Sequence, residues 1–388
     1  MTSKRFAGHT VVVVALLQIA ALPMPLERAA LDGGWNITRA TLVAGTSVSP
    51  TQIALVRGIA VHDNISLRDG TIEADLDAPR ASQFAGFAFR AASTADYEIV
   101  YFRGSGGQWK EVQYQPLFDG EPTWQLYSGP GYSADLPSDS AATAGPMHVK
   151  IVFAGTRANV YVNRAPQPVL RIRELKRAPQ AGHVAVWAAG DRTAQMTFAN
   201  YSAVERVEST LEPLAPVPPS PGQIMRWRVS ARLPSPDTIN APAELSPEHR
   251  DALRSGKIAD AESDGLMNLS RIVGNPAGPQ VENVFGGAGW GLALTSVTLD
   301  ANEARTAPLR FGYSEGISIF LNGRRVFAGT NLYSTPNLGR VVADANTVEL
   351  PLNRGANELV FAVTDRAFGW GFRARLDDKN VTAIVPAP

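Results

Sequence analysis

The sequence lacks cysteine, an imbalance of charge and sustained helical periodicity. None of its 388 residues is cysteine, which excludes disulfides, thiolate nucleophiles and cysteine metal sites. Lysine plus arginine equals aspartate plus glutamate at 36 each, so no overall field favours nucleic acid or an anionic membrane as a partner. The 34 glycines and 28 prolines favour many short strands joined by turns. The hydrophobic fraction of 45% is that of a globular protein.

Long apolar runs are also missing, apart from a short one near the N-terminus. Residues 11–22 are apolar except for Gln18, and Lys4 and Arg5 precede them. Such a run is too short to span a bilayer, whereas a basic start followed by a short apolar stretch is typical of a secretory signal. We therefore predict a signal peptide over residues 1–30, and a secreted, periplasmic or cell-surface protein with no membrane span after signal removal. An uncleaved anchor is the alternative.

A proline-rich segment divides the chain. Five prolines within residues 211–222 cannot supply ladder hydrogen bonds and favour an extended, semi-rigid spacer. We predict a linker over 208–222, between a first domain at 31–207 and a second domain at 223–384. Each domain is large enough to bury a core of its own.

The predicted first domain shows the alternation of apolar and polar residues that is typical of strands. Residues 82–90 and 97–103 are expected to form one hairpin, and residues 147–153 and 157–162 another. Strands at this spacing, with turn residues between them, indicate a sandwich.

The predicted second domain is also rich in strands. Asn322-Gly323 lies between two apolar runs and is the strongest short hairpin signal. Ser246 followed by Pro247 predicts the start of one helix, with Gly256 just past its end. The predicted fold class is therefore all-β: two antiparallel β-sandwich (jelly-roll) domains joined by the proline-rich linker.

One strand-like stretch carries three carboxylates. Glu73, Asp75 and Asp77 alternate with apolar residues, so a strand would turn all three to one face. A retaining glycosidase needs two carboxyl groups about 5–5.5 Å apart. The stretch is similar to the Glu-x-Asp-x-(x)-Glu strand of family-16-type glucanases, but its last carboxylate is an aspartate and no tryptophan adjoins it. We interpret it as the solvated face of a strand, with a glycoside hydrolase using Glu73 and Asp75 or Asp77 as the alternative.

Other catalytic and cofactor motifs find less support. The sequence has no Gly-x-Ser-x-Gly elbow for a hydrolase serine, and the glycines of residues 285–291 do not form a dinucleotide cradle. The histidines outside the leader show no metal-ligand spacing. We therefore predict no cofactor and no metal.

Aromatic and amide side chains are dense between residues 97 and 132. Alternation in residues 97–103 predicts that Val100 and Phe102 point inward, while Tyr101 and Arg103 point outward. Sugars present C–H faces that stack on aromatic rings and hydroxyls that pair with amides and guanidinium groups. Burial of these rings in a sandwich core is the alternative. The residues predicted to bind such a ligand are Arg90, Tyr101, Arg103, Gln113, Gln115 and Trp124.

Several stretches of the first domain resemble concanavalin A-like, laminin-G-like jelly rolls of the keto-disaccharide-hydrolase group. They are residues 84–90, 97–103, 113–116, 124–129, 131–134, 148–152 and 158–162. The resemblance implies a secreted bacterial sandwich but not an activity, because this group mixes lectins, adhesive modules and glycanases. Many relatives bind calcium; Asp63-Asn64 and Asp119-Gly120 are ordinary turn residues and do not oblige it.

The second domain resembles a galactose-binding-like jelly roll, the accessory module of many glycosidases. Residues 317–323, 350–359 and 370–377 carry this likeness: a strand, an Asn-Gly hairpin and a strand after Gly-x-Asn. Trp290, Tyr333 and Trp370 adjoin glycine-rich or polar loops and are second-domain ligand candidates, with packing under a loop as the alternative.

These observations favour a carbohydrate-recognition protein that binds a glycan or a glycosylated surface without catalysis. A glycoside hydrolase is the first alternative. A scaffold or adhesion protein without a sugar site is the second, and a large exposed apolar patch would favour it.

Overall fold

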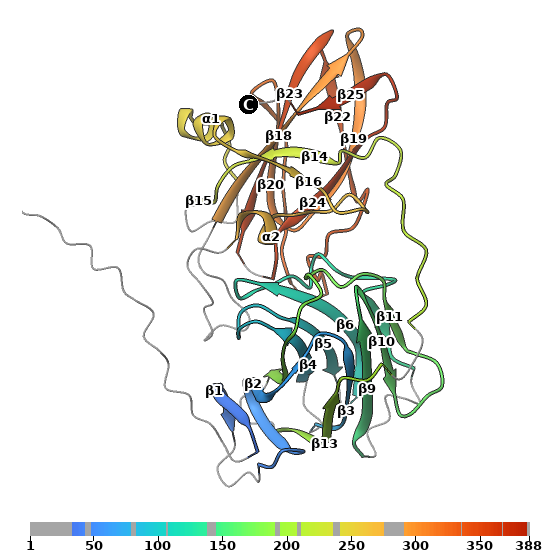
Figure 1. Cartoon of the computed structure of the whole chain (residues 1–388). Coiled ribbons are helices and arrows are strands. Elements are labelled where there is room, and N and C mark those ends of the chain that lie inside the picture. The colour runs from blue at the N-terminus through green and yellow to red at the C-terminus, as the bar shows by residue number, and fades with distance from the viewer. Residues whose placement is uncertain are drawn as a thin grey trace, which may run out of the picture.

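The computed structural model describes residues 33–42, 48–78, 83–105, 108–137, 145–190, 195–207, 211–235, 241–274, 291–334, 336–366 and 368–385. The predicted signal peptide lies outside these residues. The described chain is all-β, as predicted, and forms two halves stacked end to end (Figure 1). Residues 211–222 contain neither helix nor strand and run along one side of the molecule from the first half to the second (Figure 1).

The first half is built on one antiparallel sheet of 13 strands. Two strands lie off its main path: β1 (Trp35–Leu42) pairs with β2, and β8 (Ser133–Asp135) pairs with β6. The main path runs in the order β11 (Leu170–Ile172), β10 (Arg157–Val162), β9 (Met147–Ala154), β3 (Gly70–Asp77), β13 (Met196–Val204), β2 (Ile53–Leu67), β12 (Gly182–Gly190), β4 (Gln83–Ala91), β5 (Glu98–Ser105), β6 (Gln108–Phe118) and β7 (Glu121–Pro122).

This sheet curls so that its two flanks face each other across a shared core. The ring of Phe89 on β4 stacks on that of Phe153 on β9, with centroids 4.4 Å apart. Phe87, also on β4, meets Phe198 on β13 at 5.4 Å. Contacts between strands that are distant in the sheet order produce the two layers of a sandwich from one continuous sheet.

The second half packs an eight-stranded sheet against a four-stranded sheet. The larger sheet has the order β16 (Lys257–Asp260), β14 (Arg226–Val229), β18 (Gly291–Ala301), β23 (Gly355–Asp365), β20 (Glu315–Leu321) and β21 (Arg324–Asn331), with β15 (Leu233–Pro234) and β25 (Val381–Ile384) also paired to β18. The smaller sheet has the order β17 (Met267–Asn268), β24 (Gly371–Leu376), β19 (Arg305–Tyr313) and β22 (Asn346–Leu352).

Aromatic rings fill the space between these two sheets. Trp227 on β14 and Phe361 on β23 both contact Phe372 on β24, at 5.0 and 4.8 Å between centroids. Two short helices accompany the sheets: α1 (Pro247–Arg254) and α2 (Leu269–Val273).

Local sequence signals predicted several of these elements correctly. Strands β4 and β5 form a hairpin, as do β9 and β10, and Asn322-Gly323 joins β20 to β21. The Ser246 side chain accepts a hydrogen bond from the backbone N–H of His249, and Pro247 is the first residue of α1. These features need only neighbouring residues, which is why the sequence alone predicts them.

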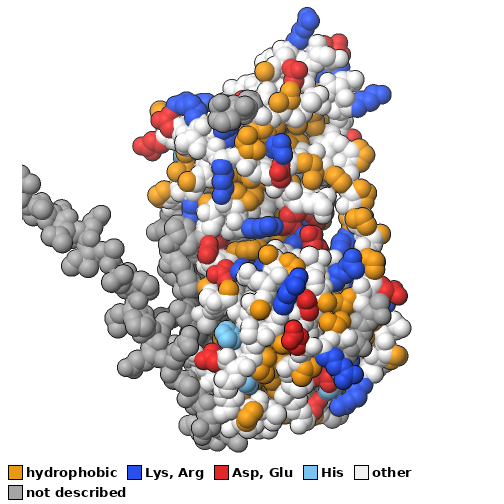
Figure 2. All heavy atoms as spheres, viewed as in Figure 1, with side chains coloured by type: hydrophobic (Ala, Val, Ile, Leu, Met, Phe, Trp, Pro, Cys, Tyr) orange, Lys and Arg blue, Asp and Glu red, His pale blue; other side chains and the backbone are white. Residues whose placement is uncertain are grey.

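Buried polar contacts join the two halves. The Tyr127 hydroxyl donates to a carboxylate oxygen of Glu262 at 2.5 Å and accepts from the Asn268 amide at 2.8 Å. The Ser270 hydroxyl donates to Glu121 at 3.0 Å. Charged side chains of both signs gather along the boundary between the halves (Figure 2). Burying these polar groups costs free energy unless their hydrogen bonds form. They therefore favour the relative placement of the two halves in which those bonds are made.

Candidate functional site

The outer face of β5 and β6 meets the second half of the molecule. Val100 and Phe102 belong to the main core of the first half, as the alternation predicted. Tyr101 points the other way, into a smaller apolar cluster with Trp124 and with Phe368 from the second half. This face is therefore largely covered, and Tyr101 retains only 3% of its exposure.

Gln113 holds the segment that carries Trp124. Its side-chain oxygen accepts from the Tyr101 hydroxyl at 2.8 Å, and its amide donates to the backbone carbonyls of Trp124 and Tyr127 at 2.8 and 2.6 Å. Burial raises the pKa of Tyr101 to about 12, so this phenol stays a neutral donor. Gln115 has a similar role, because its side-chain oxygen accepts from the Thr123 backbone N–H at 3.1 Å.

Both glutamine side chains, predicted to bind a ligand, are buried in this structure. Gln113 is 1% exposed and Gln115 is 5% exposed, and both bond to the chain itself. In this conformation Tyr101, Gln113 and Gln115 lie beneath the segment that carries Trp124 and hold it in place. A direct ligand contact by any of them stays a prediction.

Arg90, which was predicted to contact a ligand, is buried in this structure. Its guanidinium group donates to the Arg68 carbonyl at 2.7 Å, to Asp69 at 3.0 Å and to the Gly155 carbonyl at 2.8 Å. The register of β4 against β12 slips between His183 and Ala185, where one extra β4 residue is inserted. A bulge of this kind breaks strict alternation and turns Arg90, at φ 51°, into the interior.

Arg103 remains partly exposed and lies between two aromatic rings. Its guanidinium carbon is 5.7 Å from the Phe84 ring and 5.3 Å from the Trp124 ring. It also pairs with Glu111 at 3.5 Å. Stacked guanidinium groups of this kind are held flat and keep outward donors for a planar or hydroxylated partner.

The second half completes this surface. Arg340 pairs with the same Glu111 carboxylate at 2.6 Å, so two guanidinium groups share one negative charge. Tyr333 places its ring edge-on to Trp124, with centroids 5.8 Å apart. It is 46% exposed, among the most exposed large apolar side chains of the described chain.

We call this set the junction cluster; its members are Phe84, Arg103, Glu111, Trp124, Tyr333 and Arg340. The sequence analysis proposed Arg103, Trp124 and Tyr333 separately, and the structure brings them together. It missed Glu111 and Arg340, because no local pattern links residues that are 229 positions apart.

The second-half candidate Trp370 does not belong to the junction cluster. Trp370 is fully buried and lies beneath the Arg232 guanidinium group, 5.2 Å from its ring centroid. Packing under a loop, the alternative weighed for it, fits this placement. Trp290 lies outside the described residues.

The three carboxylates of β3 point outward on the opposite flank of the curled sheet. Ile72, Ala74 and Leu76 face the core, as predicted. Asp75 accepts from the Asn200 amide at 2.7 Å and pairs with His148 at 2.7 Å. Four strands separate β3 from β5 in the sheet order, so these carboxylates are not part of the junction cluster.

The surroundings of Asp75 do not suit a general acid. Burial by itself would raise the pKa of Asp75, but the hydrogen bonds from Asn200 and His148 together lower it below its usual range. A glycosidase acid needs a raised value. Glu73 lines a hollow of about 410 Å³ together with Thr71, Ser202, Val204, Glu205 and Arg206. Asp75 and Asp77 are not among the lining residues.

Two further findings concern the described residues alone. Within them, no group of three or more His, Asp or Glu side chains is placed to hold a metal ion. None of their helices is both long enough and apolar enough to cross a membrane.

No protein-family model and no curated protein matches the chain. Similar solved structures include carbohydrate binding module CBM66 from Bacillus subtilis, at 13% identity and a TM-score of 0.30 over 45% of this chain and 98% of that one. They also include a Bacillus licheniformis beta-glucanase, at 12% identity and a TM-score of 0.31 over 42% of this chain and 84% of that one. At TM-scores below 0.5 these similarities carry no argument about this chain's function.

Proposed function

We propose that this protein recognises carbohydrate at the junction cluster and does not cleave it. The observation that carries the proposal is the exposed Tyr333 ring standing against Trp124, beside the stacked guanidinium group of Arg103. Aromatic faces suit the C–H faces of a sugar ring, and guanidinium and carboxylate groups suit its hydroxyls.

Both halves contribute to this surface. Arg103, Glu111 and Trp124 come from the first half, while Tyr333 and Arg340 come from the second. We therefore propose that the two predicted domains bind their ligand as one unit.

The experiment measures binding of the full mature chain to a panel of neutral glycans. We expect Tyr333→Ala to weaken binding about fivefold, because an aromatic contact contributes about 1 kcal/mol. The matched control is Val342→Ala, since Val342 is 57% exposed and is not a member of the junction cluster. Equal loss in both variants, or no loss in Tyr333→Ala, would contradict the proposed site.

Hydrolysis at β3 is the second candidate function. The observation that favours it is the hollow beside Glu73. Because we propose recognition without cleavage, we expect the wild type to turn over no glycan in the panel. Turnover by the wild type that Glu73→Gln abolishes, and that Glu349→Gln at an exposed position on β22 leaves intact, would replace recognition by hydrolysis.

We also propose that the chain is exported, which rests on its N-terminal sequence. The measurement is the mass of the protein recovered from outside the cytoplasm. A mass lacking about the first 30 residues supports the proposal, and full-length protein retained in the cytoplasm contradicts it.

A further inference from the structure

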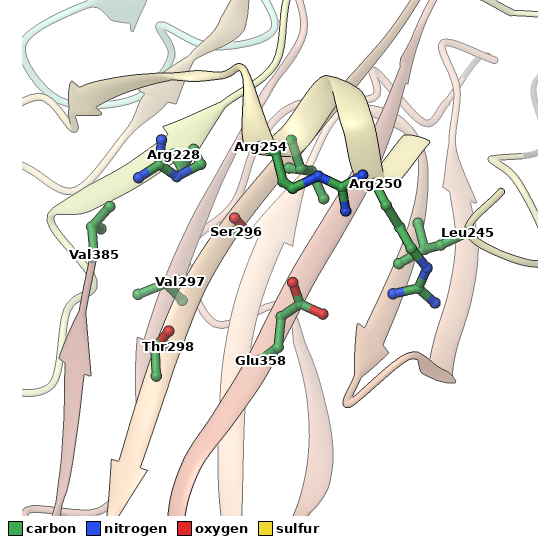
Figure 3. Close-up of a pocket in the computed structure, with 10 residues that line it drawn as sticks. Arg228, Leu245, Arg250, Arg254, Ser296, Val297, Thr298, Glu358 and Val385 are labelled. Atoms are coloured by element: carbon green, nitrogen blue, oxygen red, sulfur yellow. The ribbon is translucent and has the colours of Figure 1, made fainter. Parts of the chain in front are cut away.

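A second hollow lies on the outer face of the eight-stranded sheet, beside helix α1 (Figure 3). Leu292 and Leu294 on β18, with Val360 and Ala362 on β23, form an apolar patch against Leu245 and Leu253. Alternation continues this face along β18 to Ser296 and Thr298, and along β23 to Glu358. The hollow therefore opens where the cover provided by α1 ends.

The lining of this hollow is predominantly cationic. Arg228, Arg250 and Arg254 line it together with a single carboxylate, that of Glu358, which is a formal excess of two positive charges. Arg228 is held in place because its guanidinium group donates to the Gly256 carbonyl at 3.0 Å. In Figure 3 the side chains of Arg254 and Arg250 run along one side of the hollow and Arg228 lies on the other.

Two arginines of the lining lie close together on α1. Arg250 and Arg254 are four residues apart, a spacing at which like charges lie on the same side of a helix and repel. Arg254 also pairs with Asp251, which is not among the residues lining the hollow. A bound anion would relieve the repulsion between these two arginines.

The remaining lining suits a small hydroxylated body. Ser296 and Thr298 supply hydroxyl groups, while Leu245, Leu253 and Val385 supply apolar surface. The hollow measures about 220 Å³, below the range of drug-sized ligand pockets at about 300–1,000 Å³. That volume suits one sugar ring rather than an extended chain.

We propose that this arginine-lined hollow binds one acidic sugar residue, with its carboxylate or sulfate group on Arg250 and Arg254. The sugar class rests on the proposed function, but the site is separate from the junction cluster and uses the second half alone. Uronates and sulfated sugars share the required negative charge, and the experiment separates them.

The test uses the full mature chain and measures dissociation constants for galacturonate, galactose 6-sulfate, galactose and inorganic sulfate. We expect the double variant Arg250→Gln/Arg254→Gln to bind the acidic sugar at least tenfold more weakly, because charge-assisted hydrogen bonds are lost. The matched control is Arg271→Gln/Lys379→Gln, which removes two exposed positive charges from the same half at positions that do not line the hollow. Tighter binding of galacturonate or of galactose 6-sulfate identifies which acidic group the hollow takes.

Three outcomes would overturn the inference. They are equal weakening in both double variants, binding of galactose as tight as that of the acidic sugars, and inorganic sulfate binding as tightly as either of them. Tyr333→Ala separates the two sites. If it abolishes neutral-glycan binding but leaves acidic-sugar binding intact, both proposals stand. If no neutral glycan binds the wild type, the junction proposal fails while the arginine-lined hollow is still tested by its own variant.

Discussion

Glu98 offers a sharp test of the electrostatics in the first half. Its carboxylate is fully buried and accepts hydrogen bonds from the Tyr114 hydroxyl at 2.5 Å and the Arg177 backbone N–H at 2.9 Å. Tyr114 in turn accepts from the Lys176 backbone N–H at 2.7 Å, so its own hydrogen is directed at Glu98. Burial outweighs these donors and raises the pKa of Glu98 from 4.5 to about 7. The informative substitution is Glu98→Gln.

The direction of the effect follows from the raised pKa. The folded protein prefers the protonated carboxyl, so this contribution to stability is complete below about pH 4.5 and is lost as the pH rises to about 7. Each pKa unit corresponds to about 1.4 kcal/mol, so the loss is about 3 kcal/mol. The glutamine variant cannot titrate. Its side chain has one acceptor oxygen for two donors, so the variant is less stable by about 1 kcal/mol at every pH from the lost hydrogen bond.

The assay is urea-induced unfolding of wild type and variant at pH 5 and pH 8. We expect the stability of wild type minus that of Glu98→Gln to fall by about 2.5 kcal/mol between these two conditions, because a small part of the contribution is already lost at pH 5. Glu349→Gln, at an exposed position on β22, is the control and should show no such change. A difference that is flat, or that grows with pH, would refute the reasoning.

Three more predictions follow from the same structure. Glu121 and Asp365 lie buried across the junction; burial is the main cause that raises the pKa of each, and their mutual repulsion adds to the shift of Glu121. Glu121→Gln should therefore slow proteolysis within residues 211–222 at pH 9 relative to wild type, and an unchanged rate would contradict this. Gly323 adopts φ 80° in the β20–β21 turn, so Gly323→Ala should cost about 1 kcal/mol in thermal unfolding, which an unaltered melting temperature would disprove. The pKa of Asp75 is lower in the folded than in the unfolded protein, so the ionised carboxylate stabilises the fold above about pH 4, and this stabilisation is lost as the pH falls further. Asp75→Asn should therefore make the decline in stability below about pH 4 less steep in an acid titration. A decline as steep as that of wild type would argue against the contacts to Asn200 and His148.

Arg90 and Tyr101 mark the limit of reading side-chain direction from the sequence. Both were predicted to contact a ligand, which strict alternation along their strands would allow by turning each side chain outward. Alternation holds for Tyr101, whose neighbours Val100 and Phe102 lie in the main core. It fails for Arg90, because the inserted residue in β4 shifts the parity just before that position. A bulge depends on the pairing of two strands, so no pattern within one strand predicts it.

The junction cluster marks a second limit. Trp124 was predicted from the density of aromatic and amide residues around it, and Tyr333 from a neighbouring polar loop. Their contact depends on how the two halves pack. Leu338 and Phe368 also cover the face that carries Tyr101. Exposure of a strand face is decided by what packs against it, and here that neighbour comes from more than 200 residues further along the chain.

The sequence by itself determined the all-β class, the β4–β5 and β9–β10 hairpins, the Asn322-Gly323 turn and the Ser246 cap of α1. Those features depend on backbone preferences and on interactions between residues that are close along the chain. Only the tertiary structure decided that Arg90, Gln113 and Gln115 are buried, that Arg103 and Arg340 share Glu111, and that three arginines surround one hollow. Such arrangements arise from contacts between distant segments, whose free energy depends on the packing of the whole fold rather than on any local pattern.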